Sequence, residues 1–165
     1  MARIVEMAGS ISARLAMAKA EKAYAAGDYC TAATEFRSLA EKGDALAQVM
    51  LAAMYYDGQG VPQDDGAAVL WYRTAADQGD AQGEMYLGLM YFNGRGVPQS
   101  DDEAVKFWYK SAQQGDPRAQ SNLGVMYRDG RCVQRSDEEA AKWWRKAAEQ
   151  GFDVARRNLE TLERR

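Results

Sequence analysis

The chain has 165 residues, which is enough for a hydrophobic core without help from disulfides or a structural metal. Hydrophobic residues make up 47% of the chain and charged residues 27%, with only three prolines, so a disordered or linker-rich chain is excluded. A net charge of -3 provides no basic footprint, and neither nucleic acid nor an anionic membrane surface is predicted as a partner.

The first twenty residues are predicted to form a helix that belongs to the mature protein rather than a cleaved signal peptide. Arg3 precedes a stretch of small residues and methionines, but Glu6 and Arg14 interrupt it, so it lacks the apolar centre of a signal peptide. No run of about 18 apolar residues occurs, and no membrane-spanning helix is expected. The compartment stays open: cytoplasmic, or periplasmic or secreted if a longer natural leader has been removed.

A repeat of 36 residues organises the chain from residue 43 onward. The dipeptide Gly-Asp begins at 43, 79 and 115, and Gly151 falls on the same step. Leucine, methionine, tyrosine and glycine recur in the same register, at Leu51, Leu87, Leu123 and Leu159, at Met54, Met90 and Met126, at Tyr55, Tyr91 and Tyr127, and at Gly58, Gly94 and Gly130. The predicted repeats are 43–78, 79–114 and 115–150, followed by a C-terminal capping helix at 151–165.

Each repeat predicts two helices joined by a loop. Leu51, Met54 and Tyr55 are spaced i, i+3 and i+4, which places them on one face of the first helix. Alanine or glycine recurs beside that stripe, at Ala52, Gly88 and Gly124. Because glycine costs about 1 kcal/mol in a helix, its use there predicts a close approach by a neighbouring helix.

The loops and the second helices also recur. Gly58-Gln59-Gly60-Val61-Pro62 returns at 94–98, with glycines where left-handed backbone is expected. Ser100 with Glu103, and Ser136 with Glu139, predict capping boxes at the start of the second helices. Those helices carry the aromatic pairs Trp71-Tyr72, Phe107-Trp108 and Trp143-Trp144.

The motif Leu-Gly-x-Met-Tyr-x-x-Gly-x-Gly-Val-Pro, followed by Ala-x-x-Trp-Tyr and a closing Ala-Ala-x-x-Gly-Asp, resembles the Sel1-like repeat over residues 43–162. The resemblance implies an all-α, right-handed superhelical solenoid of antiparallel helix pairs, related to tetratricopeptide arrays, whose members serve as adaptors. Gly27-Asp28-Tyr29 and Phe36 are similar to a tetratricopeptide-like pair, so residues 1–42 are expected to cap the array.

The third loop departs from the family pattern. Cys132 replaces the second loop glycine and Gln134 replaces the proline, so a rearranged loop is expected. The cysteine-rich branch of the family staples each repeat with a disulfide, whereas Cys30 and Cys132 lie more than two repeats apart. That separation exceeds the reach of about 4.4–6.8 Å between Cα atoms that a disulfide requires, so two independent thiols are predicted.

Little in the sequence predicts catalysis, a cofactor or a metal. The chain has no histidine, and its Gly-x-Gly loops follow helices and lack the lysine of a phosphate-binding loop. Acidic clusters such as 101–103 are interpreted as helix caps rather than as calcium ligands. The paired aromatic residues admit two readings, a ligand cage or a core between helices, and their fixed repeat position favours the core. A reactive Cys132 thiol is the weaker alternative to a neutral substitution.

A partner-binding surface is predicted on the first helices, because in tetratricopeptide arrays these helices line the concave face. An apolar groove with a basic rim is expected there, suited to a helix or extended segment with an acidic flank. The predicted partner-binding residues are Val49, Ala53, Tyr56, Gln82, Met85, Leu89, Phe92, Asn93, Arg118, Val125 and Arg128. The alternatives are that curvature or the N-terminal helix of residues 1–18 covers these side chains, or that the contact is homodimeric.

The leading functional hypothesis is a non-catalytic interaction adaptor that binds another protein. An immunity-type inhibitor of a secreted toxic enzyme is the narrower alternative, because some Sel1-like proteins are encoded beside secreted effectors. A hydrolase that uses carboxylates alone is the third hypothesis, disfavoured because no positioned base or metal set is visible.

Overall fold

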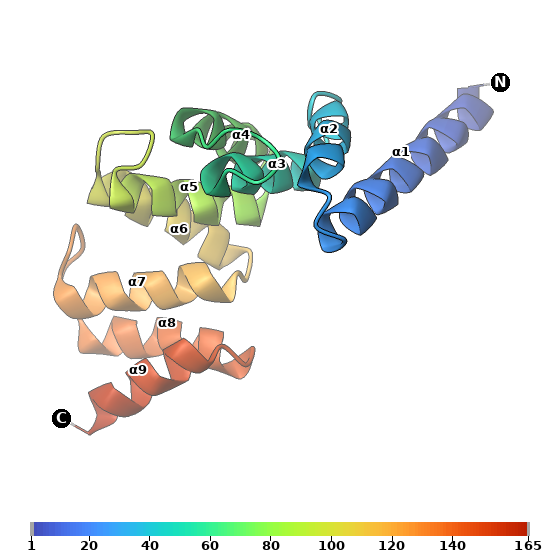
Figure 1. The fold of residues 1–165 in the computed structure, drawn as a ribbon. Coiled ribbons are helices and arrows are strands. Elements are labelled where there is room, and N and C mark those ends of the chain that lie inside the picture. Colours follow the sequence, from blue (N-terminus) through green and yellow to red (C-terminus); the bar gives the residue numbers. More distant parts are fainter. Residues whose placement is uncertain (1, 165) are drawn as a thin grey trace. The chain divides into compact units, whose positions relative to one another are not determined.

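The computed structural model describes residues 2–164, with side chains from residue 11 onward. This part of the chain consists of nine α-helices and no strands (Figure 1). The helices are α1 Ala2–Ala25, α2 Tyr29–Ala40, α3 Ala45–Asp57, α4 Asp65–Asp77, α5 Ala81–Asn93, α6 Asp101–Gln113, α7 Pro117–Asp129, α8 Asp137–Glu149 and α9 Asp153–Glu163. The all-α repeat fold predicted from the sequence is confirmed. None of the described helices combines the length and apolar character needed to cross a membrane.

The chain divides into two compact units, Met1–Gln78 and Gly79–Arg165. In the first unit, α1 packs against α2, α2 against α3, and α3 against α4. Its core holds Phe36, Leu39, Leu51 and Met54, each at most 2% exposed. The side chains of residues 2–10, part of the N-terminal helix that was the alternative cover for the groove, lie outside the described residues.

The second unit contains α5 to α9, again packed in chain order. The leucine and methionine stripe predicted by the repeat forms its core, because Leu87, Leu123, Met90 and Met126 are at most 1% exposed. Trp108 and Trp144, the second aromatic residue of each pair, are buried beside this stripe. The predicted core role of the aromatic pairs is confirmed for Tyr72, Phe107, Trp108, Trp143 and Trp144, which are at most 7% exposed, whereas Trp71 is half-buried.

The recurring Gly-Asp dipeptide marks the junction between consecutive repeats. Gly79 and Gly115 adopt positive φ angles of 80° and 99°, a backbone region that suits glycine because it has no Cβ. The aspartate that follows caps the next helix: Asp80 accepts from the Gly83 N–H at 2.8 Å, and Asp116 accepts from the Ala119 N–H at 3.0 Å. The dipeptide therefore ends one repeat and begins the next.

The predicted capping boxes form only in part. Ser100 accepts from the Glu103 N–H and Ser136 from the Glu139 N–H, as the sequence indicates. The two glutamate side chains bind lysines instead, with Lys106 Nζ 3.3 Å from Glu103 and Lys142 Nζ 3.2 Å from Glu139. The lysine one turn further along competes successfully for the carboxylate that a full capping box would use.

The third loop keeps the conformation of the other two loops, contrary to the rearrangement expected from its sequence. Cys132 has φ 55°, close to φ 70° at Gly60 and φ 68° at Gly96. A left-handed conformation costs a residue with a Cβ about 1–2 kcal/mol. The Cys132 thiol donates to Asp102, and this bond, with the negative field of Asp101 and Asp102, raises the pKa of the thiol. A raised pKa disfavours the thiolate, and Cys30 and Cys132 are both exposed free thiols.

We expect the Cys132→Gly variant to be about 1 kcal/mol more stable than the wild type, because glycine removes the left-handed penalty. The shift in the midpoint of urea unfolding, followed by circular dichroism, measures it. Cys132→Ala is the matched control, since it also loses the thiol but keeps a Cβ. Equal stability of the glycine and alanine variants would show that the loop holds no backbone strain.

Candidate functional site

The predicted partner-binding residues fall into two classes of exposure. Val49 and Met85 are 3% exposed, so they offer almost no surface to a partner. They occupy the same repeat position as Ser121, and the backbone oxygens of Met85 and Ser121 accept the indole N–H groups of Trp108 and Trp144 at 3.1 and 3.0 Å. This position faces the second helix rather than solvent, which corrects the register taken from tetratricopeptide repeats.

The other predicted residues reach the surface. In the first unit Ala53 and Tyr56 are half-buried. In the second unit Gln82 and Asn93 are exposed, and the remaining residues are half-buried, namely Leu89, Phe92, Arg118, Val125 and Arg128. The candidate site described below lies entirely in the second unit.

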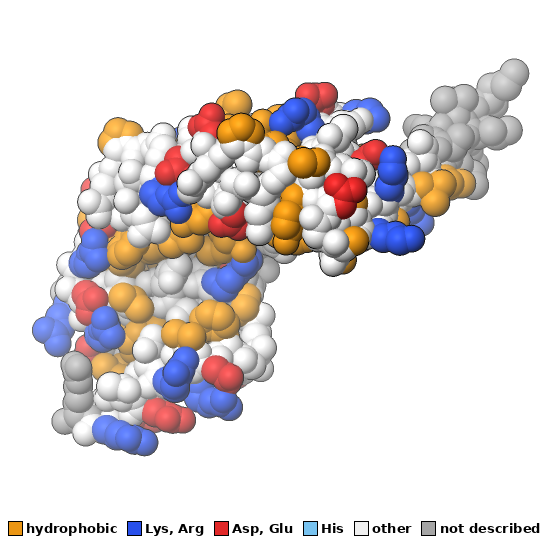
Figure 2. Space-filling view, viewed as in Figure 1, with side chains coloured by type: hydrophobic (Ala, Val, Ile, Leu, Met, Phe, Trp, Pro, Cys, Tyr) orange, Lys and Arg blue, Asp and Glu red, His pale blue; other side chains and the backbone are white. Residues whose placement is uncertain are grey.

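An apolar hollow of about 180 Å³ lies between α5 and α7. Its floor is formed by Trp108 and Met126, which are 2% and 0% exposed. Its walls are formed by half-buried side chains of α5 and α7, namely Leu89, Phe92, Asn122 and Val125. In the space-filling view of this unit, hydrophobic side chains gather over α5 and α7 and charged ones lie at their margins (Figure 2). Hereafter we call this the apolar hollow.

Arginines border the apolar hollow, but neighbouring groups neutralise them. Arg131 lies 4.7 Å from the Phe92 ring centroid and forms a paired hydrogen bond to Asp101, at 2.8 and 2.9 Å. Arg128 donates to Asp129 at 2.6 Å, and this bond lowers the pKa of the Asp129 carboxyl. The basic rim expected from the sequence is therefore a rim of ion pairs.

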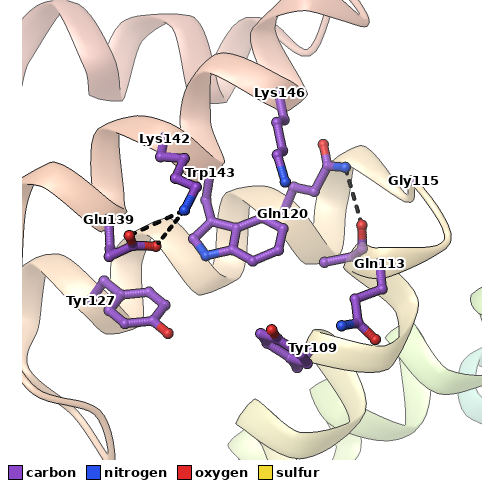
Figure 3. A pocket seen from close by; sticks show the side chains of 10 residues that line it. Tyr109, Gln113, Gly115, Gln120, Tyr127, Glu139, Lys142, Trp143 and Lys146 are labelled. Carbon is purple, nitrogen blue, oxygen red and sulfur yellow. Dashed lines mark hydrogen bonds and ion pairs between the residues drawn. The ribbon is translucent and has the colours of Figure 1, made fainter.

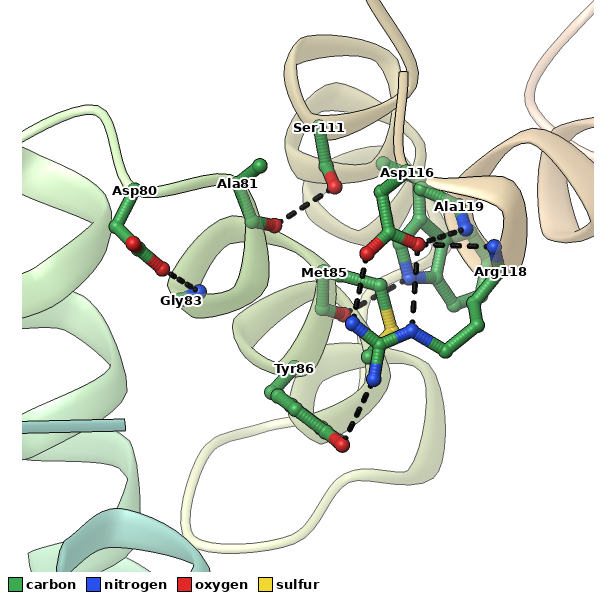
Figure 4. Close-up of polar contacts among 10 residues, drawn as sticks. Asp80, Ala81, Gly83, Met85, Tyr86, Ser111, Asp116, Arg118 and Ala119 are labelled. Atoms are coloured by element: carbon green, nitrogen blue, oxygen red, sulfur yellow. Dashed lines mark hydrogen bonds and ion pairs between the residues drawn. The ribbon is translucent and has the colours of Figure 1, made fainter. Parts of the chain in front are cut away.

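Arg118 connects the start of α7 to α5 (Figure 4). Its guanidinium donates to the Asp116 carboxylate at 2.7 Å and to the Tyr86 hydroxyl at 2.9 Å. Nearby, the Ser111 hydroxyl donates to the Ala81 backbone oxygen at 2.7 Å. The Arg118–Tyr86 bond joins α7 to α5, and the Ser111–Ala81 bond joins α6 to α5, so the apolar hollow is a pre-formed feature of the unit.

Polar pairs that sequence reasoning did not identify are repeated along the chain. Gln120 Nε2 donates to the Ala112 backbone oxygen, and Gln150 donates to Gln120 at 2.9 Å. One repeat earlier, Gln114 donates to Glu84 at 2.8 Å, and Glu84 is 4% exposed. The sequence pattern that could have revealed these pairs is the recurrence of an amide or carboxyl residue at 48, 84 and 120, on an otherwise apolar helix face.

Burial raises the pKa of Glu84 above its usual 4.5, and Lys110 and Gln114 offset this only in part. The folded state therefore binds the proton more tightly than the unfolded state, and that contribution is lost as the pH rises through the folded pKa. We expect Glu84→Gln to be about 1 kcal/mol more stable than the wild type at pH 7. Thermal or urea unfolding should show the difference shrinking as the pH falls toward 4.5.

The matched control for Glu84→Gln is Gln120→Glu, which places a carboxyl at the same position one repeat further along. This variant should be less stable than the wild type at neutral pH and recover on acidification. The raised pKa would be contradicted if the free energy of unfolding of Glu84→Gln exceeded that of the wild type by the same amount at pH 4 and at pH 7.

A second hollow, of about 380 Å³, lies between α6 and α8 over α7 (Figure 3). Aromatic and basic side chains contribute to its lining. The lining includes Tyr109, Gln120, Tyr127, Lys142, Trp143 and Lys146. Lys142 binds Glu139, whereas Lys146 forms no ion pair within the described residues and lies 4.3 Å from the Trp143 ring centroid. Hereafter we call this the lysine hollow.

Trp143 differs from the other indoles of the second unit. It is 6% exposed, and its Nε1 is the one buried side-chain nitrogen or oxygen of the described residues that has no hydrogen-bond partner. A buried donor without a partner costs about 1–3 kcal/mol. The Tyr109 ring packs against Trp143 edge to face at 5.9 Å, and an aromatic ring is a weak acceptor compared with an oxygen.

Neither hollow presents a metal site, because no group of three or more His, Cys, Asp or Glu side chains in the described part is arranged to hold an ion. Asp101, Asp116 and Asp129 are each paired with an arginine.

Comparison with known proteins assigns the repeat. A family model described as Sel1 repeat matches residues 45–80, 81–116 and 117–152. No curated protein matches the chain. Among solved structures, the chain is similar to a Sel1 repeat protein from Oxalobacter formigenes, with 33% identity, a TM-score of 0.83, and coverage of 87% of this chain and 58% of that one.

Two further structures extend the comparison. A protective antigen of uropathogenic Escherichia coli strains, displaying an SLR fold, is 37% identical over 79% of this chain, with a TM-score of 0.76, and this chain spans only 28% of its length. Cysteine rich protein B of Helicobacter pylori is 24% identical over 57% of this chain and 68% of its own, with a TM-score of 0.52, which supports the fold alone.

Proposed function

Because the chain belongs to the Sel1 repeat family, whose members are generally non-catalytic scaffolds for protein–protein interaction, we propose that it is a binding module and that the apolar hollow holds a segment of its partner. The observation that carries this proposal is the apolar surface between α5 and α7, where Leu89, Phe92 and Val125 stand over a buried floor. Apolar surface left open on a folded unit is typical of an interaction site.

The chemistry of the apolar hollow indicates the kind of segment. Its volume of about 180 Å³ suits one or two apolar side chains, as a helix or an extended segment would present. The single polar wall residue, Asn122, offers an amide that can bind a backbone group of that segment. Because the bordering arginines are already paired with Asp101 and Asp129, we propose that apolar contact contributes more to affinity than an acidic flank does.

Site-specific photo-crosslinking in cells of the source organism tests the proposal. A benzophenone amino acid placed at Val125 should yield a discrete crosslinked protein, because this side chain lines the apolar hollow. The same amino acid at Leu70, which is 60% exposed on α4, serves as the control. A discrete product from position 70 and none from position 125 would contradict the proposal. The identity of the product decides between an adaptor and an inhibitor of an enzyme.

A further inference from the structure

The lysine hollow contains a buried hydrogen-bond donor without an acceptor, which the proposed function does not use. Figure 3 shows the Trp143 indole at the centre of the hollow, with its nitrogen edge turned toward the space between Tyr109 and Tyr127. The indoles of Trp108 and Trp144, in contrast, each donate to a backbone oxygen inside the unit. The Trp143 N–H therefore has no acceptor, whereas the N–H groups of Trp108 and Trp144 are used in hydrogen bonds within the unit.

The preceding repeat provides an internal comparison. Phe107 occupies the position of Trp143, and it too lies between two lysines, with Lys106 Nζ and Lys110 Nζ each 5.6 Å from its ring centroid. The arrangement of lysine, aromatic ring and lysine is thus shared by the second and third repeats, whereas the first repeat has Leu70 and Thr74 at the lysine positions. Phenylalanine fills this place in the second repeat without a polar atom, whereas the first and third repeats carry an indole N–H there, at Trp71 and Trp143.

The charge of the lysine hollow favours an anionic ligand. Lys142 and Lys146 face it together with a single carboxylate, that of Glu139, which leaves an excess of one positive charge. Lys146 forms no ion pair in the part of the chain that the structure describes. A ligand carboxylate near these lysines would gain charge-assisted hydrogen bonds that the unliganded surface lacks.

We propose that the lysine hollow binds an acidic residue within an extended segment of another protein. The ligand's carboxylate lies between Lys142 and Lys146, and a backbone oxygen of the same segment accepts the Trp143 N–H. The methylene groups of the ligand pack on Tyr127. The volume of about 380 Å³ accommodates one residue and its flanking backbone.

Tyr109 controls access to the N–H. It is 43% exposed and packs against Trp143, whose nitrogen is closed to solvent in the unliganded protein. Since a half-exposed tyrosine side chain changes rotamer readily, binding proceeds with rotation of Tyr109 away from the indole. The site is independent of the apolar hollow, because the two share none of their lining residues.

The test is a titration of the ¹⁵N-labelled protein, followed through the indole N–H resonances in ¹H–¹⁵N spectra. The probe is the capped tripeptide acetyl-Gly-Glu-Gly-amide, and the matched control peptide carries glutamine in place of glutamate. The Trp143 resonance is assigned by its absence in Trp143→Phe, a variant that installs the residue of the preceding repeat. We expect this resonance to move downfield and saturate with the glutamate peptide, while those of Trp108 and Trp144 stay in place.

Matched lysine variants decide whether the lysine hollow is responsible. Lys142→Gln/Lys146→Gln should weaken binding at least five-fold, whereas Lys106→Gln/Lys110→Gln, at the same positions one repeat earlier, should leave it unchanged. Circular dichroism confirms that each variant is folded. An unmoved Trp143 resonance, an equal shift with the glutamine peptide, an equal shift with acetate alone, or equal effects of the two lysine variants would each overturn the proposal.

Discussion

The Gly124→Ala variant is expected to lower the free energy of unfolding by about 3 kcal/mol, although alanine is the better helix former. A Cβ on Gly124 would lie 2.5 Å from Cδ1 of the buried Trp144 indole, and a Cβ on Gly88 would lie 2.6 Å from Cδ1 of Trp108. Trp144 is fixed by its hydrogen bond to the Ser121 oxygen, so the ring has no free direction in which to retreat. Urea denaturation followed by tryptophan fluorescence and circular dichroism measures the loss.

The first repeat indicates which second substitution should restore stability. It has Ala52 at the position of Gly124 and Tyr72 at the position of Trp144, and both residues are at most 2% exposed. The double variant Gly124→Ala/Trp144→Tyr should therefore recover at least about 1 kcal/mol relative to the sum of its single changes. Gly66→Ala, at an exposed glycine of α4, is the control and should be neutral or stabilising. A destabilisation of Gly124→Ala no larger than that of Gly66→Ala would contradict the packing argument.

The double variant Leu89→Glu/Val125→Glu is expected to weaken binding of the crosslinked partner at least about 100-fold, or about 2.7 kcal/mol. Both side chains line the apolar hollow while remaining half-buried, so carboxylates there would meet apolar partner groups without unfolding the core beneath. Isothermal titration calorimetry with the purified partner measures the change.

Equivalent substitutions elsewhere on the surface are the control for that variant. Leu70→Glu/Val154→Glu makes the same two chemical changes at side chains that are 60% and 44% exposed. Its affinity for the partner should equal that of the wild type. A comparable loss in both double variants would show that added negative charge, rather than the apolar hollow, governs binding.

The repeat register predicted the fold because the same buried positions and the same close contact between helices return every 36 residues. Leu123 and Met126 are buried at the spacing that the sequence displays, and the glycine beside them is explained by the indole of the second helix. The third loop was mispredicted, because the substitution at Cys132 is visible in the sequence whereas the tolerance of its backbone for φ 55° is not.

The details of the candidate site were less accessible from the sequence. Helical periodicity identifies a face but not its rotation relative to the neighbouring helix, so Met85 was assigned to the groove although its backbone receives the Trp108 indole. The ion pairs of Arg118 and Arg128 join residues that are one or two positions apart, and their neutralising effect needed the side-chain geometry. Trp143 looked like a core residue by repeat position, and only its unpaired nitrogen distinguishes it.

We propose that a partner binds at the α5–α7 face of the second unit. Hydrogen–deuterium exchange of the protein with and without its crosslinked partner tests it directly, because exchange reports the protection of each helix separately. We expect protection on binding to increase in Ala81–Asn93 and Pro117–Asp129, the helices whose side chains line the apolar hollow. Increased protection confined to other helices, with these two unchanged, would contradict it.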